Sequence, residues 1–270
     1  MRYTGIQPQY FPRLHYFARI LNTDIFMARD DVQYVKKHKY PDGRTDKSYQ
    51  SHTPIKQSFG RHLLSVPVED KFSPINKTSI SYDPDWVADH LKTLQFAYGR
   101  SANFKKLFPE LEQALTAKFK TIADINLATI VWGILHLLGE KEISIKKLTI
   151  GYVNNLLADQ SIFRLKKISR ASFSEAAREI EKLHPNEKII ALCKEVGATE
   201  DYCGGTGATA YMDETFYKES GIKIKVQDWK CDEYHQLFTK QQGFIPNLSI
   251  IDLLMNTSLK EAQNIIASND

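Results

Sequence analysis

The sequence has few cysteines and no long apolar segment, and each absence excludes a class of protein. Its three cysteines, Cys193, Cys203 and Cys231, lack C-x-x-C spacing, which argues against a disulfide framework and a structural zinc site. No stretch reaches the roughly 18 uninterrupted apolar residues that a membrane helix needs, since the run at 130–138 is too short. The first residues have neither the basic start nor the apolar run of a signal peptide. We therefore predict a cytoplasmic protein without a transmembrane segment and without a metal site.

The sequence also has little excess charge of either sign. Its 36 basic and 32 acidic residues give a formal net charge of +4, which argues against nucleic acid as a partner. The same small excess suits a local basic pocket for an anionic small molecule. Basic residues cluster at 36–39 and at 166–167. A solvated face is the alternative interpretation of both clusters, because isolated surface charges contribute little.

What the sequence does contain is the pattern of a folded α/β protein. Hydrophobic residues make up 42% and charged residues 25%, values that fit a globular chain and not a disordered one. Residues 3–6 and 24–28 read as strands. Between them, Leu14, Phe17 and Leu21 recur at helical spacing. Such a strand–helix–strand unit predicts a parallel pair of strands.

The remaining elements follow from helix start and stop signals. We predict one unit over residues 1–270, with a helical sub-region at about 83–140 inserted between α/β parts 1–82 and 141–270. A polar stretch at 29–61 precedes the insertion. Helices are expected from Asp83-Pro84, Asn103, Ile122, Glu187, Asp213 and Ser249, and strands at 62–68 and 222–226. The predicted fold class is α/β, with a Rossmann-like, mostly parallel sheet and a helical insertion in the middle of the chain.

Polar residues follow the first predicted strand. Gln7, Gln9 and Tyr10 lie between that strand and the first helix, and ligands of open α/β sheets bind at the carboxyl ends of strands. The amides at the start of the helix can hold a phosphate or carboxylate. These residues are therefore candidates for substrate binding. The alternative is that Gln7 caps a turn and Tyr10 fills the core.

Candidate catalytic groups lie near the same edge of the sheet. Asp30 and Asp31 follow the second strand, and a pair of close carboxylates suits general-base chemistry. His15 lies one turn after Pro12 and is the third catalytic candidate. A helix cap, a salt bridge or a satisfied histidine is the alternative for each.

Two further groups are candidates for binding substrate. Gln33 and Tyr34 continue the cluster, and Lys36 and Lys37 would hold a diphosphate, unless they are simply solvated. A glycine-rich loop follows a short strand near Cys203; it matches neither the P-loop nor G-x-G-x-x-G. The glycines of this loop would let its backbone approach a sugar or phosphate closely. The alternative is that the loop forms a tight turn. Its candidate residues are Gly204, Gly205 and Gly207.

Two motifs resemble the opening signature of the WbqC-like family. They are IQPQYFP at 6–12, followed by Tyr16-Phe17, and DDVQY at 30–34, followed by a lysine. Weaker matches at 63–68, 197–207, 234–236 and 248–254 follow in the family's order, so the resemblance spans about residues 5–256. Two departures stand beside the expected site. Arg13-Leu14-His15 replaces the family's WLG, and residues 40–51 carry extra positions, which leaves the substrate choice open.

The resemblance implies a role in surface-polysaccharide and O-antigen assembly. The resemblance implies this pathway more firmly than a reaction. Our first hypothesis is an enzyme, a transferase of acyl or aminoacyl groups or an amide-forming ligase, that acts on the amine of a nucleotide-linked amino sugar. Gln7, Gln9 and Tyr10 would then bind the nucleotide sugar or ATP, and Asp30 or Asp31 would deprotonate the amine. A second small-molecule substrate would be an amino acid, and a homo-oligomer is left open. The alternative is a non-catalytic protein of the same pathway that binds a nucleotide sugar or acts as a scaffold.

Overall fold

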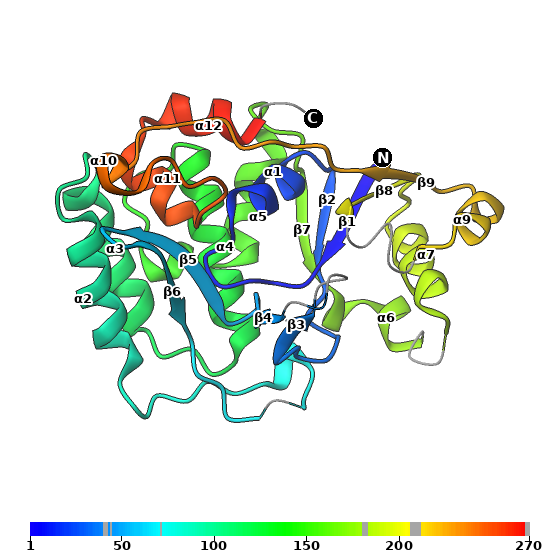
Figure 1. Cartoon of the computed structure of the whole chain (residues 1–270). Helices are drawn as coiled ribbons and strands as arrows, with labels where there is room; N and C mark the ends of the chain where they lie inside the picture. The colour runs from blue at the N-terminus through cyan, green and yellow to red at the C-terminus, as the bar shows by residue number, and fades with distance from the viewer. Residues whose placement is uncertain (40–42, 44, 71, 180–182, 206–211, 268–270) are drawn as a thin grey trace.

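Residues 1–39, 43, 45–70, 72–179, 183–205 and 212–267 are described by a computed structural model. Within them, five strands form one sheet in which neighbouring strands are parallel (Figure 1). The order across the sheet is β7-β2-β1-β8-β9. The bounds are β1 (Arg2–Ile6), β2 (Ile25–Ala28), β7 (Lys167–Arg170), β8 (Glu200–Cys203) and β9 (Lys223–Val226). The predicted Rossmann-like α/β fold is confirmed.

The first strand–helix–strand unit forms as its pattern predicts. Helix α1 (Leu14–Leu21) connects β1 to β2, and these strands pair in parallel, with Tyr3 opposite Ile25 and Ile6 opposite Ala28. The apolar side of α1 is fully buried at Leu14, Phe17 and Ile20. Because β1 and β2 are neighbours and parallel, their carboxyl ends meet at one edge of the sheet.

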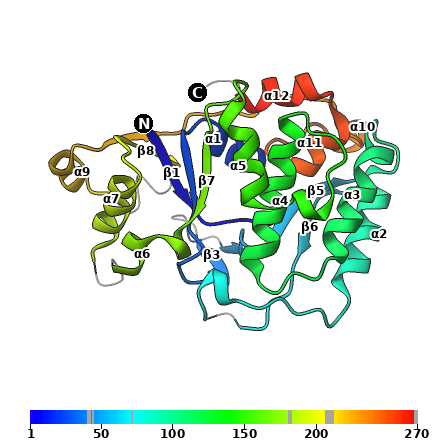
Figure 2. The same cartoon turned by 180° about the vertical axis from the view of Figure 1, so that it is seen from behind.

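Helices cover both faces of the sheet. Alternate residues of β2 point to opposite faces, and Phe26 belongs to the large core whereas Met27 belongs to a smaller one. On the face of Phe26 lie α1, α4 (Ile122–Leu137) and α5 (Ile150–Asp159). The opposite face is covered by α6 (Glu175–Glu179), α7 (Pro185–Glu195) and α9 (Glu214–Ser220), as the two opposite views show (Figures 1 and 2).

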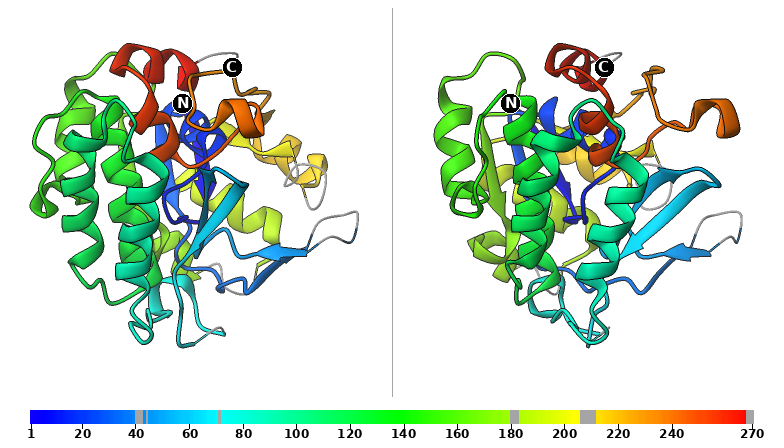
Figure 3. Two further views of the ribbon diagram at one scale, coloured as in Figure 1. Left: turned by 60° about the vertical axis from the view of Figure 1, so that its left-hand side comes forward. Right: turned by 90° about the vertical axis from the view of Figure 1, so that its left-hand side faces the viewer.

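The long insertion between β2 and β7 contains more than helices. Two antiparallel hairpins precede the helices and lie on the same side of the molecule (Figure 3). They consist of β3 (Lys37–Lys39), β4 (Thr45–Lys47), β5 (His52–Gln57) and β6 (Gly60–Ser65). The sequence predicted a polar stretch at 29–61 and did not identify strands within it, whereas the structure forms β3, β4, β5 and the start of β6 there. Strand β5 is buried along its whole length, because its polar side chains find hydrogen-bond partners in other elements.

The helices of the insertion begin close to the predicted positions. They are α2 (Trp86–Tyr98), α3 (Phe104–Thr116), α4 and α5. The predicted cap of α2 at Asp83 is wrong by two residues. The carboxylate of Asp85 accepts a hydrogen bond from the Ala88 amide at 3.2 Å. Asp85 is the cap because it lies three residues before this amide, which has no partner within the helix. The carboxyl-terminal part forms α10 (Thr239–Gln242), α11 (Ile250–Asn256) and α12 (Leu259–Ala267).

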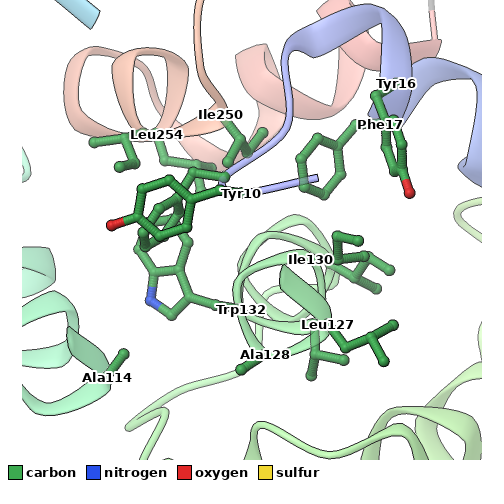
Figure 4. Close-up of a cluster of buried hydrophobic side chains, with 14 of the residues drawn as sticks. Tyr10, Tyr16, Phe17, Ala114, Leu127, Ala128, Ile130, Trp132, Ile250 and Leu254 are labelled. Atoms are coloured by element: carbon green, nitrogen blue, oxygen red, sulfur yellow. The ribbon is translucent and has the colours of Figure 1, made fainter. Parts of the chain in front are cut away.

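Helix α4 is the centre of the large core. Its residues are buried around the whole circumference, which is typical of a helix enclosed by other elements. Figure 4 shows Trp132 and Ile130 on α4 beneath Tyr10, Phe17 and Ile250. The core thus joins α1, which follows the first strand, to α11 near the end of the chain. None of the helices in the described ranges is long and apolar enough to cross a membrane.

The chain reverses its direction across the sheet between β1 and β8. From β1 it passes to β2 and then β7 on one side, whereas β8 and β9 extend the sheet on the other side. The loops that leave the carboxyl ends of two such strands diverge, and ligands of open α/β sheets bind in the resulting crevice. The fold therefore predicts a ligand-binding crevice at the carboxyl ends of β1 and β8.

Candidate functional site

A cavity of about 750 Å³ lies at this reversal point. Its walls include Ile6 and Gln7 at the end of β1, Cys203 and Gly204 at the end of β8, and Gln227 just after β9. The volume falls within the range of roughly 300–1,000 Å³ that small-molecule sites occupy. The cavity is therefore the candidate binding site of the described structure.

The lining of the cavity is strongly basic. It includes Arg13, Arg19, Arg29 and Lys188, whereas Asp201 is the one acidic residue among the described lining. A concave site lined by charges of one sign concentrates ligands of the opposite sign. Although the whole chain has an excess of only four positive charges, basic side chains outnumber acidic ones in the described lining of the cavity.

Asp31 orients one of these cations. Both of its oxygens accept hydrogen bonds from Arg29, at 2.8 Å from Nε and 3.0 Å from Nη2. Such a bidentate pair fixes the plane of the guanidinium group. Because Asp31 is paired in this way and Arg29 lines the cavity, the geometry favours a role for Asp31 in positioning Arg29, and its role as a base stays a prediction.

Asp30 is occupied still more fully. Its side chain has no exposure; Arg170 Nε donates to Oδ2 at 2.7 Å, and Ser172 donates from N and from Oγ. These bonds join the end of β2 to the segment that follows β7. These contacts and the absence of exposure favour the salt bridge that was the alternative to a catalytic role for Asp30.

Arg19 is held in place by a chain of side-chain and backbone contacts. Its Nε donates to Gln227 Oε1 at 2.9 Å, and Gln227 Nε2 donates to the carbonyl of His15 at 2.9 Å. The guanidinium group lies against Gly204, where a Cβ would fall only 3.0 Å from Cζ of Arg19. Gly204 therefore leaves the space that Arg19 occupies, which is a specific use for the first glycine of the predicted glycine-rich loop.

The imidazole of His15 has a defined tautomer. Asn247 Oδ1 accepts the backbone amide of His15 at 3.0 Å, so this atom is an acceptor. Nδ1 of His15 lies 3.0 Å from the same oxygen and must therefore carry the proton in the neutral ring. Nε2 is then the basic nitrogen, and no hydrogen bond from a described residue reaches it. His15 lines the cavity, so this nitrogen is the candidate base.

Burial, with Arg19 next in effect, lowers the pKa of His15 to about 4, against the opposing hydrogen bond to Asn247. The ring is consequently neutral at pH 7, and a neutral ring can accept a proton. An anion in the cavity would favour the imidazolium form and bring the pKa of His15 closer to neutrality.

Asp201 and Cys203 form part of the cavity wall contributed by β8. Burial raises the pKa of the Asp201 carboxyl to about 6, although the hydrogen bond from Tyr217 and the charge of Arg19 oppose the shift. Burial and the nearby Asp201 raise the pKa of the Cys203 thiol to about 11. Cys203 is therefore protonated at neutral pH, which argues against a thiolate nucleophile.

One wall of the cavity is polar and aromatic. Gln9, Gln50 and Tyr49 line it, and the guanidinium carbon of Arg13 lies 4.7 Å from the centre of the Tyr49 ring. Gln50 is buried and accepts the Val35 amide through Oε1, whereas no described residue accepts a hydrogen bond from its Nε2. This wall offers amide groups and an aromatic ring to a ligand.

The start of α1 does not form the predicted anion site. The amide of Leu14 donates to the Leu248 carbonyl at 3.2 Å, and the amide of His15 donates to Asn247. The segment before α11 thus satisfies the groups that a phosphate would otherwise bind. Anion binding in this cavity depends on side chains and not on the end of this helix.

Several of the residues predicted from sequence lie apart from the cavity lining. Tyr10 is fully buried in the core, where its hydroxyl lies 3.1 Å from Nδ1 of His90 (Figure 4). Tyr34 is buried against Ser51, with 2.6 Å between the two hydroxyl oxygens. Gln33, Lys36 and Lys37 are exposed and are absent from the described lining. Tyr10 and Tyr34 are packing residues, which was the alternative stated for Tyr10.

The residues that do line the cavity include five of the predicted ones. They are Gln7, Gln9, His15, Gly204 and Gly205, whereas Gly207 falls outside the described residues. The sequence interpretation missed Arg19, Arg29, Lys188, Asp201 and Gln227. Arg29 and Gln227 directly follow strands and were recognisable by the rule that identified Gln7. Arg19 and Lys188 lie within helices, where no sequence pattern marked them as site residues. No group of three or more metal-binding side chains occurs in the described ranges.

Comparison with known proteins identifies the family. The model of the WbqC-like protein family matches residues 7–264. The uncharacterized protein Rv1507c of Mycobacterium tuberculosis (strain ATCC 25618 / H37Rv) is 26% identical over 254 residues, which cover 93% of this chain and 91% of that protein. No solved structure matches. With motifs and family model in agreement over nearly the whole chain, the protein belongs to the WbqC-like protein family.

Proposed function

We propose that the chain binds a nucleotide-linked amino sugar in the basic cavity and transfers an acyl or aminoacyl group to its amine. The observation that carries the proposal is the cluster of four cations, Arg13, Arg19, Arg29 and Lys188, around a cavity at the sheet reversal point. A diphosphate supplies the complementary charge. The volume accommodates a nucleoside and a sugar besides the phosphates.

The polar wall supports the nucleotide part of the proposal. Tyr49, on which Arg13 packs, contributes an aromatic surface beside which a base can lie, and Gln9 offers an amide group to the edge of the base. The bidentate pair of Arg29 with Asp31 presets one guanidinium group for a phosphate. We assign these contacts to binding of the nucleotide. They require no movement of the strands.

His15 would act as the general base of the transfer. The amine nitrogen attacks the carbonyl carbon of an activated donor, a thioester or an acyl adenylate, and Nε2 of His15 takes the proton that this nitrogen loses. A carbon–nitrogen bond forms and the bond to sulfur or to the adenylate oxygen breaks. The departing group then takes the proton from His15. A bound diphosphate assists by raising the pKa of His15 from about 4.

The proposed pathway is surface-polysaccharide and O-antigen assembly, which the resemblance of the sequence motifs implies. In this proposal the reaction acts on a sugar precursor in the cytoplasm, before the sugar joins a polymer. Amide formation on an amino sugar is a modification of this kind.

A titration calorimetry series tests the binding half of the proposal. Wild type is expected to bind uridine diphosphate and to bind uridine at least about tenfold more weakly, because the cations recognise the phosphates. Arg29→Met and Lys188→Met should each weaken diphosphate binding, whereas Lys92→Met, which removes an equal charge from the exposed surface of α2, should not. Equal effects of all three variants would show that binding depends on net charge and not on this cavity.

The chemical half is tested by mass spectrometry of the acceptor after incubation with each donor class. An amide product that His15→Gln reduces by about a hundredfold or more is the expected result for loss of a general base. A product that His15→Gln leaves unchanged would remove His15 from the chemistry.

A second candidate function is favoured by a specific observation. Asp30 and Asp31, the two acids that the family motif supplies, are both engaged in ion pairs. A protein that only holds a nucleotide sugar for a partner enzyme would need no free acid. Tight binding of the nucleotide sugar with no amide product from either donor class would favour this function.

A further inference from the structure

The carboxylate of Asp201 is poorly satisfied compared with the other buried acids described. It is 3% exposed, and Tyr217 donates to Oδ2 at 2.9 Å. No other described residue donates a hydrogen bond to this carboxyl, and no described cation forms an ion pair with it. Asp30, in contrast, accepts three hydrogen bonds, and Asp252 accepts one from each of two tyrosines.

The sheet register places Asp201 at the floor of the cavity. Asp201 lies opposite Tyr3 in the β1–β8 pair, two residues before Cys203 ends β8. Gln7 and Gly204, which follow the strands, lie nearer the opening at the carboxyl edge. A ligand that enters from that edge would pass Gln7 and Gly204 before it reaches Asp201, and the charge of Arg19 acts on the Asp201 carboxyl.

A buried acid in this position has no structural explanation on the described contacts. Burying a carboxylate without full hydrogen bonding costs free energy, and the hydrogen bond from Tyr217 and the charge of Arg19 offset this cost only in part, since the pKa of Asp201 stays raised. A donor group of a ligand would complete its hydrogen bonding. The cavity would then hold a ligand with charges of both signs, because Arg13, Arg19, Arg29 and Lys188 line the rest of it.

We propose that Asp201 forms an acidic subsite at the floor of the cavity, which binds the amino group of a ligand whose phosphates are held by the basic residues. The inference rests on the proposed function and adds a specificity determinant to it. Asp201 distinguishes an amino sugar from a sugar with a hydroxyl at the same position, because only the ammonium group supplies both charge and several donors. Asp201 recognises the ammonium form on binding. The nitrogen loses one proton to solvent before it attacks, and His15 takes the proton that the nitrogen loses on attack.

The test measures the binding of three probes to each of three proteins. The probes are UDP, UDP-glucosamine and UDP-glucose, which share the nucleotide and differ in the group to be recognised. The proteins are wild type, Asp201→Asn and Tyr217→Phe, and calorimetric titration gives each dissociation constant. Asp201→Asn removes the charge at constant shape, whereas Tyr217→Phe removes the structural partner and keeps the acid.

Wild type and Tyr217→Phe are expected to bind UDP-glucosamine at least about tenfold more tightly than UDP-glucose, as a charge-assisted hydrogen bond allows. In Asp201→Asn this preference should vanish, while UDP binds within about twofold of wild type. A preference that survives in Asp201→Asn overturns the inference.

If Asp201→Asn does not fold, the dissociation constants of wild type for the three probes still test the inference. Binding of UDP without a preference for UDP-glucosamine overturns the acidic subsite and leaves the basic binding site standing. Failure of wild type to bind UDP, UDP-glucosamine and UDP-glucose overturns the proposed function, and the acidic subsite with it.

Discussion

At the scale of single residues, the imidazole of His15 is the group most sensitive to a ligand. Its free-state pKa of about 4 reflects burial and the neighbouring Arg19, and an anion would offset the charge of Arg19. The pKa of His90 is also lowered to about 4 by burial, but His90 pairs with Tyr10 in the core and is absent from the described lining of the cavity. The two histidines therefore form a matched pair for titration.

We expect UDP to raise the pKa of His15 by about one unit or more and to leave that of His90 unchanged. Because binding then takes up protons, affinity for UDP should increase as the pH falls through the ligand-bound pKa toward 4. Nuclear magnetic resonance titration of the two rings, with and without UDP, measures both values. Equal shifts in the two histidines would point to a global change and not to an anion beside His15.

We predict that Gly204 supports ligand binding because it leaves space for the side chain of Arg19. A methyl group there would overlap the Arg19 guanidinium group and displace it from Gln227. We expect Gly204→Ala to weaken UDP binding by about tenfold, since a charge-assisted contact is lost, with little change in stability. Gly205→Ala is the control, because its Cβ would lie 3.9 Å from Val226 in ordinary contact. Titration of both variants with UDP distinguishes displacement of Arg19 from a general effect of stiffening the loop.

At the scale of elements, the close approach of α1 to α4 depends on a glycine within a helix. A Cβ on Gly133 would lie 2.5 Å from Cζ of Phe17. Alanine favours a helix by about 1 kcal/mol over glycine, so the sequence accepts a less stable helix in return for tighter packing. Gly151 in α5 is the matched case, because a Cβ there meets no atom within 4 Å.

We therefore expect opposite signs from the same substitution. Gly133→Ala should lower the free energy of unfolding by roughly 1–3 kcal/mol, as overpacking of a core does. Gly151→Ala should raise it by up to about 1 kcal/mol through helix propensity. Urea denaturation of the two variants gives both numbers. Stabilisation by Gly133→Ala would mean that α1 shifts readily on α4 and that this contact does not fix the start of the cavity wall.

The elements themselves were largely predictable because their signals are local. The spacing of Leu14, Phe17 and Leu21 predicts α1, and Asp213 with Gly221 brackets α9 as cap and left-handed stop. The strand predicted at 62–68 overlaps β6, whereas β3, β4 and β5 were missed, and β5 is a buried strand of polar composition. Its Lys56 is satisfied by Gln236 and by a carbonyl at Gly243, nearly two hundred residues away in the chain.

The site was predictable in position but only partly in composition. The rule that ligands bind at the carboxyl ends of strands correctly points to Gln7, which lines the cavity. The same rule pointed to Asp30, whose carboxylate is instead enclosed by Arg170 from a strand 140 residues later. Pairing between distant segments decides which polar groups remain available to a ligand, and a single sequence does not reveal that pairing.

At the scale of the whole molecule, one buried network joins three distant segments of the chain. Asp252 on α11 accepts hydrogen bonds at 2.8 Å from Tyr98 on α2 and at 2.8 Å from Tyr234. Lys56 of β5 contributes a favourable charge. Burial nevertheless raises the pKa of the Asp252 carboxyl to about 6, because the hydrogen bonds and Lys56 only partly offset desolvation.

This network makes the stability of the fold depend on pH in a defined direction. A carboxyl whose folded pKa exceeds its unfolded value of 3.8 stabilises the fold fully below pH 3.8, and this contribution is lost as the pH rises through about 6. Asp252→Asn has no such group, so its stability relative to wild type should improve by roughly 2 kcal/mol between pH 4 and pH 7, the part of the shift that falls in this range. Tyr98→Phe should do the reverse, because loss of a donor raises the pKa of Asp252 further and widens the loss. Urea unfolding of the three proteins across this range measures both trends. Parallel stability curves for wild type and Asp252→Asn would mean that the carboxyl is ionised without cost and that Lys56 fully compensates its charge.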